Sequence, residues 1–193
     1  MGVGGARPGV LGGAFDPPHL GHLALARGGW SHFGLDRLLV RVVEDPGHKD
    51  VPTPACVRLD LVRLAFSAVP GVEVELDPHA RTVDSLEALA LPDPVFLLGA
   101  DEFAEFLTWK EPERVLELAR LGVGTRPGVP SDRVEDVRAS LARPDRVELF
   151  EIEPHDVSSV QLRTLAAGGR PLDGFVPAAV AERIRKLGLY RVA

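Results

Sequence analysis

Short apolar runs rich in β-branched residues alternate with longer helical patterns along this 193-residue chain. Strands separated by helices form right-handed βαβ units, so the alternation predicts an α/β fold: a doubly wound, mostly parallel sheet with helices on both faces. Such a sheet binds ligands at the carboxyl ends of its strands, where the strand order reverses. The expected strands are 10–11, 38–43, 72–76, 95–98, 121–125 and 147–152, and the expected helices are 20–32, 55–68, 83–91, one or two within 101–120, 131–142 and two short ones at the end of the chain.

The chain has neither an internal repeat nor a long linker. We therefore expect a single domain over residues 1–193, with a C-terminal helical part from about residue 157. A break is expected near Pro112, and the stretch 124–131 reads as an exposed loop.

The composition of the chain argues against several classes of protein. A net charge of −6 argues against a protein that coats nucleic acid or an anionic membrane, although a local cationic site remains compatible with it. The single cysteine, Cys56, which we expect to be buried, excludes an internal disulfide and a multi-thiolate metal site. No apolar run approaches the roughly 20 residues of a membrane span. We expect a soluble, cytoplasmic protein with no nucleic-acid or membrane partner.

The segment from Gly12 to His22, GGAFDPPHLGH, combines a strand end, a glycine turn and a helix start. Backbone N–H groups and the helix dipole at such a point form an anion site. His19 and His22 lie three residues apart on one face of the first turn, and a nearby phosphate would favour their protonated form. Gly21 leaves space where a ligand could approach. The segment predicts a phosphate-binding site.

A second candidate site is the segment Val157–Arg163, VSSVQLR. Ser158 or Ser159 can cap a helix that begins there. Arg163, just over one turn later, can present a planar fork to phosphate oxygens.

These two segments resemble the signatures of the nucleotidyltransferase superfamily. The first carries the glycine pair, the Phe-Asp-Pro turn and the His-x-Gly-His tetrad in order, at 12–13, 15–17 and 19–22. The second resembles Ile-Ser-Ser-Thr-x-Ile-Arg, with Val160 in place of the threonine. The resemblance implies a Rossmann-like nucleotidyltransferase fold with short C-terminal helices.

The middle of the chain is similar to the bacterial nicotinate-nucleotide adenylyltransferases within that superfamily. In the matching segments Gly47 stands for a proline, Arg81 for a tyrosine and Ser85 for a threonine. The segments are Pro46-Gly47-His48-Lys49, Arg81-Thr82-Val83-Asp84-Ser85-Leu86, Gly99-Ala100-Asp101, Leu107-Thr108-Trp109, Arg126-Pro127-Gly128 and Gly188-Leu189-Tyr190.

The resemblance implies an enzyme of NAD biosynthesis that joins ATP and nicotinate mononucleotide to give deamido-NAD and pyrophosphate. The mononucleotide phosphate attacks the α-phosphorus of ATP in line, without a covalent intermediate. Mg²⁺ comes with ATP and needs no metal-ligand cluster in the protein. The implied catalytic residues are His22, His19 and Arg163; the ATP-binding residues are Gly12, Gly13, Phe15, His19, His22, Arg126, Ser158, Ser159 and Arg163; and the mononucleotide-binding residues are Lys49, Thr82, Asp101 and Trp109.

Several alternatives stay open at this stage. Trp109 can be a core residue, Asp101 a helix N-cap, and Lys49 and Lys110 solvated charges. The chain can also be a sister transferase for nicotinamide mononucleotide, pantetheine phosphate or cytidylyl transfer, or a non-catalytic nucleotide-binding module. The sequence leaves open whether it forms a homo-oligomer.

Overall fold

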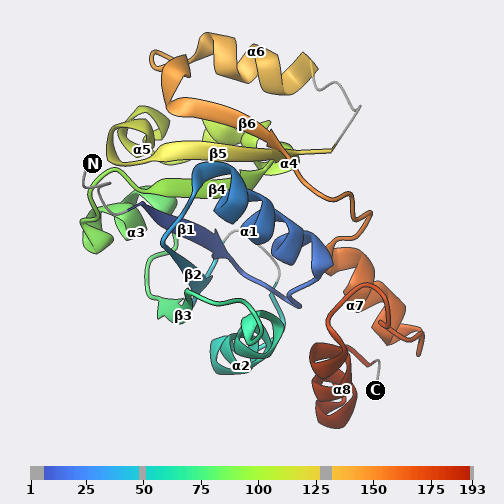
Figure 1. Cartoon of the computed structure of the whole chain (residues 1–193). Coiled ribbons are helices and arrows are strands. Elements are labelled where there is room, and N and C mark those ends of the chain that lie inside the picture. Colours follow the sequence, from blue (N-terminus) through green and yellow to red (C-terminus); the bar gives the residue numbers. More distant parts are fainter. Residues whose placement is uncertain (1–6, 48–50, 127–131, 192–193) are drawn as a thin grey trace.

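The computed structural model describes residues 7–47, 51–126 and 132–191 (Figure 1). Within them, six strands form one sheet in the order β3-β2-β1-β4-β5-β6, and all five neighbouring pairs are parallel. The doubly wound α/β fold is confirmed. The strands are β1 (Pro8–Gly13), β2 (Arg37–Val43), β3 (Val72–Asp77), β4 (Val95–Gly99), β5 (Arg120–Thr125) and β6 (Val147–Glu151).

The helices follow the predicted alternation. The segment expected to hold one or two helices contains α4, a short 3-10 helix and α5, and Pro112 begins α5. Proline suits that position because its missing N–H would have no helical partner there. The helices are α1 (Leu20–Phe33), α2 (Ala55–Phe66), α3 (Thr82–Leu89), α4 (Ala100–Phe103), α5 (Pro112–Leu118), α6 (Asp132–Ser140), α7 (Ser159–Ala167) and α8 (Ala178–Leu187), with 3-10 helices η1 (Phe106–Thr108) and η2 (Pro144–Arg146).

Two apolar clusters lie on opposite faces of the sheet, because successive side chains of a strand point to opposite faces. Val10 of β1 packs in the cluster with residues of α3, α5 and α6. Its neighbour Leu11 packs in the cluster with residues of α1, α2, α7 and α8. In β4, Leu97 and Leu98 divide between the clusters in the same way. Helices therefore cover both faces.

The strand order reverses between β1 and β4, which places the expected ligand crevice beyond the carboxyl ends of these strands. Figure 1 shows α7 and α8 close to the start of α1, and the backbone N–H of Leu20 donates to the carbonyl of Phe175 at 2.9 Å. The C-terminal helices thus reach the first motif.

Cys56 lies on the exposed face of α2, so its expected burial is wrong. The helix buries the opposite face, which carries Arg58, Leu61 and Ala65. In the described ranges, no helix is long and apolar enough to cross a bilayer.

Candidate active site

The first motif is a tight turn between β1 and α1. Phe15 adopts a left-handed backbone with φ of 53°, and its ring is buried, with 2% exposed. A Cβ on Gly13 would lie 3.1 Å from that ring, so Gly13 leaves space for the ring. The side chain of Phe15 thus belongs to the core, and only its backbone can serve the predicted ATP contact.

His19 and His22 lie against each other at the start of α1. Their rings are stacked with centroids 3.7 Å apart, and the backbone N–H of His19 donates to Nδ1 of His22 at 3.1 Å. Since Nδ1 of His22 accepts, the proton of its neutral ring sits on Nε2. A Cβ on Gly21 would lie 3.1 Å from Nδ1 of His19. The space at Gly21 therefore accommodates the His19 ring, and the expectation that a ligand approaches there stays a prediction.

Burial, and secondly the charge of His155, lower the pKa of His19 from 6.5 to about 4. His19 is therefore neutral at pH 7 in the protein alone, and the expectation that a nearby phosphate favours its protonated form stays a prediction. Positive charge near the first motif must then come from other side chains. The predicted candidates are Arg163 of the second motif and Arg126.

The second motif begins α7 as predicted. Ser158 is the N-cap: its Oγ accepts from the backbone N–H of Gln161 at 3.2 Å, and its own N–H donates to the Gln161 side chain at 2.8 Å. Val160, which stands where the resembling motif has threonine, is 63% exposed. The substitution therefore leaves the helix start intact.

The two motifs are joined by direct hydrogen bonds. Oγ of Ser159 donates to the carbonyl of Pro17 at 2.9 Å, and Nη1 of Arg163 donates to the carbonyl of Asp16 at 2.8 Å. The predicted ATP-binding residue Arg126 lies near this junction, with Nη1 3.6 Å from the carboxylate of Asp156. The structure thus brings segments more than 140 residues apart to one place.

Asp16, at the centre of the first motif, has a structural role that the sequence did not reveal. Its carboxylate is 2% exposed and accepts from the Tyr190 hydroxyl at 2.6 Å and from the backbone N–H of Thr53 at 3.4 Å. Burial, followed by the bond to Asp16, raises the pKa of Tyr190. The end of the chain is therefore held against the first motif.

Arg58 of α2 is a second buried group that sequence reasoning missed. It is 1% exposed and donates to four backbone carbonyls: Thr53 at 2.9 Å, and Ala14, Val43 and Glu44 at 2.8 Å each. Its position on the apolar face of α2 was the available signal. Arg58 holds together the loops that follow β1 and β2.

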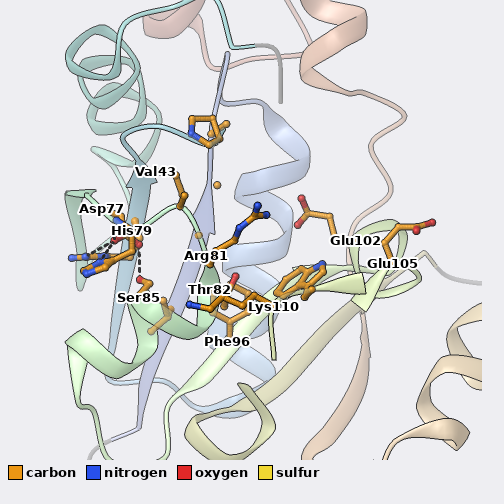
Figure 2. Close-up of a pocket in the computed structure, with 18 of the residues that line it drawn as sticks. Val43, Asp77, His79, Arg81, Thr82, Ser85, Phe96, Glu102, Glu105 and Lys110 are labelled. Carbon is orange, nitrogen blue, oxygen red and sulfur yellow. Dashed lines mark hydrogen bonds and ion pairs between the residues drawn. The ribbon is translucent and has the colours of Figure 1, made fainter. Parts of the chain in front are cut away.

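A pocket of about 420 Å³ opens beside these loops (Figure 2). It is lined by five residues that the sequence analysis singled out, Gly12, Gly13, Thr82, Asp101 and Trp109, and by Lys110. Lys49 lies outside the described residues. Of the remaining predicted residues, His19, His22, Ser158, Ser159, Arg163 and Arg126 do not line this pocket and gather around the starts of α1 and α7.

The alternatives for Trp109 and Asp101 can now be decided. Trp109 is half-buried, edge-on to Phe96 and Phe106 with centroids 6.2 and 5.3 Å away, and it lines the pocket. It is therefore more than a core residue. The N-cap of α4 is Gly99, so Asp101 is not the cap; it lies in the first turn of that helix and lines the pocket.

One wall of the pocket is a polar cluster around Asp77, which the sequence analysis did not identify. Its carboxylate, 2% exposed, accepts from Ser85 Oγ, from Arg41 Nη2 at 3.1 Å and from both the backbone N–H (3.1 Å) and Nδ1 (3.0 Å) of His79. Burial alone would raise the pKa of Asp77, but these hydrogen bonds outweigh it and lower the pKa. The cluster joins the end of β3 to α3.

The described ranges contain no group of three or more His, Cys, Asp or Glu side chains that could hold a metal ion.

Comparison with known proteins gives the family. The cytidylyltransferase-like family model matches residues 10–164. A Bordetella avium protein named "Probable nicotinate-nucleotide adenylyltransferase" is 32% identical over 97% of this chain and 99% of its own length. A protein of the same name from Symbiobacterium thermophilum is 37% identical over 96% and 95%.

Solved structures agree on the fold. The nicotinic acid mononucleotide adenylyltransferase of Plasmodium falciparum, in structures titled as complexes with APC and with NaAD, is 16% identical, with TM-scores of 0.76 and 0.77 over 96% of this chain and 97% of that one. Together with the relatives above 30% identity over nearly the full length of both chains, these matches show that the chain belongs to the cytidylyltransferase-like family and, within it, to the nicotinate-nucleotide adenylyltransferases.

Proposed function

We propose that this chain transfers the adenylyl group of ATP to nicotinate mononucleotide, giving deamido-NAD and pyrophosphate, a step of NAD biosynthesis. One observation carries the proposal: Ser159 and Arg163 bind the backbone of the first motif beside a pocket that has Trp109 in its wall. Two phosphate-binding segments and an aromatic platform are the parts that this reaction needs. The names of the relatives support the same substrates.

The two substrates would occupy the two halves of this site. The mononucleotide ring stacks on Trp109 in the pocket, with Thr82 and Asp101 as further contacts. ATP lies along Gly12 and Gly13 and extends toward the starts of α1 and α7. There it contacts the predicted ATP-binding residues outside the pocket, which are His19, His22, Arg126, Ser158, Ser159 and Arg163. Because the two glycines line the pocket, the phosphates of both substrates can approach each other there.

The reaction requires no nucleophilic side chain. A phosphate oxygen of the mononucleotide attacks the α-phosphorus of ATP; a new P–O bond forms, the bond from the α-phosphorus to the bridging oxygen breaks, and pyrophosphate leaves. Nε2 of His22 donates to the α-phosphate, His19 orients the phosphates, and Arg163 neutralises charge on the leaving group. Catalysis is then positioning and charge stabilisation.

Mg²⁺ would enter as part of the ATP substrate, held by phosphate oxygens and water. The chemistry of the described residues fits this arrangement, because both carboxylate oxygens of Asp16 already accept hydrogen bonds from Tyr190 and Thr53. We also propose that residues 1–193 form one nucleotidyltransferase domain. The single cysteine supports a cytoplasmic location.

The test is pyrophosphate release with ATP and Mg²⁺ and three acceptors in parallel, nicotinate mononucleotide, nicotinamide mononucleotide and pantetheine phosphate, beside a control without acceptor. The series is repeated with CTP. We expect the fastest release with ATP and nicotinate mononucleotide, with deamido-NAD identified by mass spectrometry. Preference for another pair would make the chain a sister transferase. Binding of ATP without any release would make it a nucleotide-binding module.

A further inference from the structure

The cationic side chains that line the pocket differ in what they already contact. Arg41, whose side chain is only 9% exposed, donates to two carboxylates. Nζ of Lys110 lies 2.7 Å from Oδ1 of Asp84. Arg81 makes no hydrogen bond or ion pair with the chain at residues 7–47, 51–126 or 132–191. Among these three, Arg81 has the guanidinium whose donors are open to a ligand.

Arg81 is placed close to the aromatic part of the pocket. It is the residue before α3, and Figure 2 shows its side chain in the middle of the lining, pointing away from Thr82 and Ser85. The ion pair between Lys110 and Asp84 joins the residue after Trp109 to the first turn of α3. A ring that stacks on Trp109 would therefore share the pocket with Arg81, beside the start of α3.

The same pocket also contains the acidic side chain of Asp101 and that of Glu105, which pairs with Arg133. The charge of Asp101 opposes the entry of an anionic ring substituent and leaves a neutral amide almost unaffected. An acid ligand therefore needs a compensating cation, and a planar guanidinium matches a carboxylate with two parallel hydrogen bonds.

We propose that Arg81 is a specificity-determining residue that binds the ring carboxylate of the acceptor and favours the acid over the amide. This inference rests on the proposed function. We assign the ring carboxylate of the acceptor to Arg81, and not its phosphate, because the phosphate must reach ATP near Gly12 and Gly13. Arg81 stands where the resembling segment has tyrosine, so the contact is specific to this chain and not part of that motif.

Two probes, each lacking one of the two anionic groups, test the assignment in the full chain. Nicotinate riboside has the carboxylate without the phosphate, and nicotinamide mononucleotide has the phosphate without the carboxylate. In calorimetry, R81Q should raise the Kd for nicotinate riboside at least roughly tenfold and leave the Kd for nicotinamide mononucleotide unchanged. R81K should restore part of the affinity, and R63Q, an exposed arginine of α2 outside the pocket, should change neither.

The outcomes separate the two proposals. Pyrophosphate release by the unaltered chain with nicotinate mononucleotide, together with an unchanged riboside Kd in R81Q, overturns the role of Arg81 and leaves the function standing. Equal weakening of both probes overturns the carboxylate assignment. If the unaltered chain shows no release with either mononucleotide, the function fails, and the specificity role of Arg81 fails with it.

Discussion

Replacing Arg58 by methionine should be among the most destabilising single substitutions in this protein. The side chain is 1% exposed, and its guanidinium donates to four carbonyls in the loops after β1 and β2 and before α2. Methionine replaces the apolar stem of arginine and lacks the guanidinium, so the main loss is in hydrogen bonding. Each carbonyl left without a donor costs about 1–3 kcal/mol if it stays dry.

The expected magnitude is smaller than the simple total of four such losses. Burial lowers the pKa of Arg58, which shows that the folded protein already bears a desolvation cost that methionine would remove. Three of the four bonds are only partly buried, so water can replace some of them. We therefore expect a loss of about 3–5 kcal/mol in the free energy of unfolding, a large share of the usual 5–15 kcal/mol.

Urea unfolding followed by circular dichroism measures this loss. With a slope near 2 kcal/mol per molar urea, the midpoint should fall by about 2 M. R63M, at an exposed position of the same helix, is the matched control and should stay within about 0.5 kcal/mol of the unaltered protein. Equal midpoints for R58M and R63M would refute the reasoning, because the four carbonyls would then not depend on the guanidinium.

Three further predictions concern the site. H22A should lower kcat by about 10² to 10³ in a protein that still unfolds cooperatively in urea, and near-normal turnover would remove His22 as the donor to the α-phosphate. W109A should raise KM for nicotinate mononucleotide far more than it lowers kcat, whereas an unchanged KM would exclude stacking. The His19 pKa is about 4 in the folded protein against an ordinary 6.5, so the unfolded chain binds more protons between these values. Stability should therefore fall as pH drops from about 6.5 to 4, less steeply in H19Q; parallel curves would contradict this.

The fold could be predicted because the signal is local and repeated. Each buried strand is a short apolar run, as in Val95–Gly99, and the face that each residue takes follows from simple alternation. The observed boundaries of the strands and helices differ from the predicted ones by only a few residues. Pro112 was the exception, since proline both interrupts a helix and begins one, and the pattern around it did not distinguish the two.

The residues of the site could be proposed from the sequence, but their geometry could not. The motifs named Ser159 and Arg163 as phosphate ligands, but nothing in either segment states that these side chains bind the backbone of Asp16 and Pro17. The same is true of the space at Gly21. A missing side chain is visible in the sequence, whereas the group that fills the space depends on the direction of the His19 ring.

The buried polar residues explain how the two halves of the site stay aligned. Arg58 binds the carbonyls of Ala14 and Val43, and both of these residues line the pocket. Asp16, two residues after Ala14, binds Tyr190 through its carboxylate and Arg163 through its carbonyl. A shift of this loop would therefore move the pocket wall and the phosphate-binding motif together. R58K, which keeps the charge but cannot reach four separated carbonyls from one nitrogen, should raise KM for both substrates, whereas W109A should act on the mononucleotide alone.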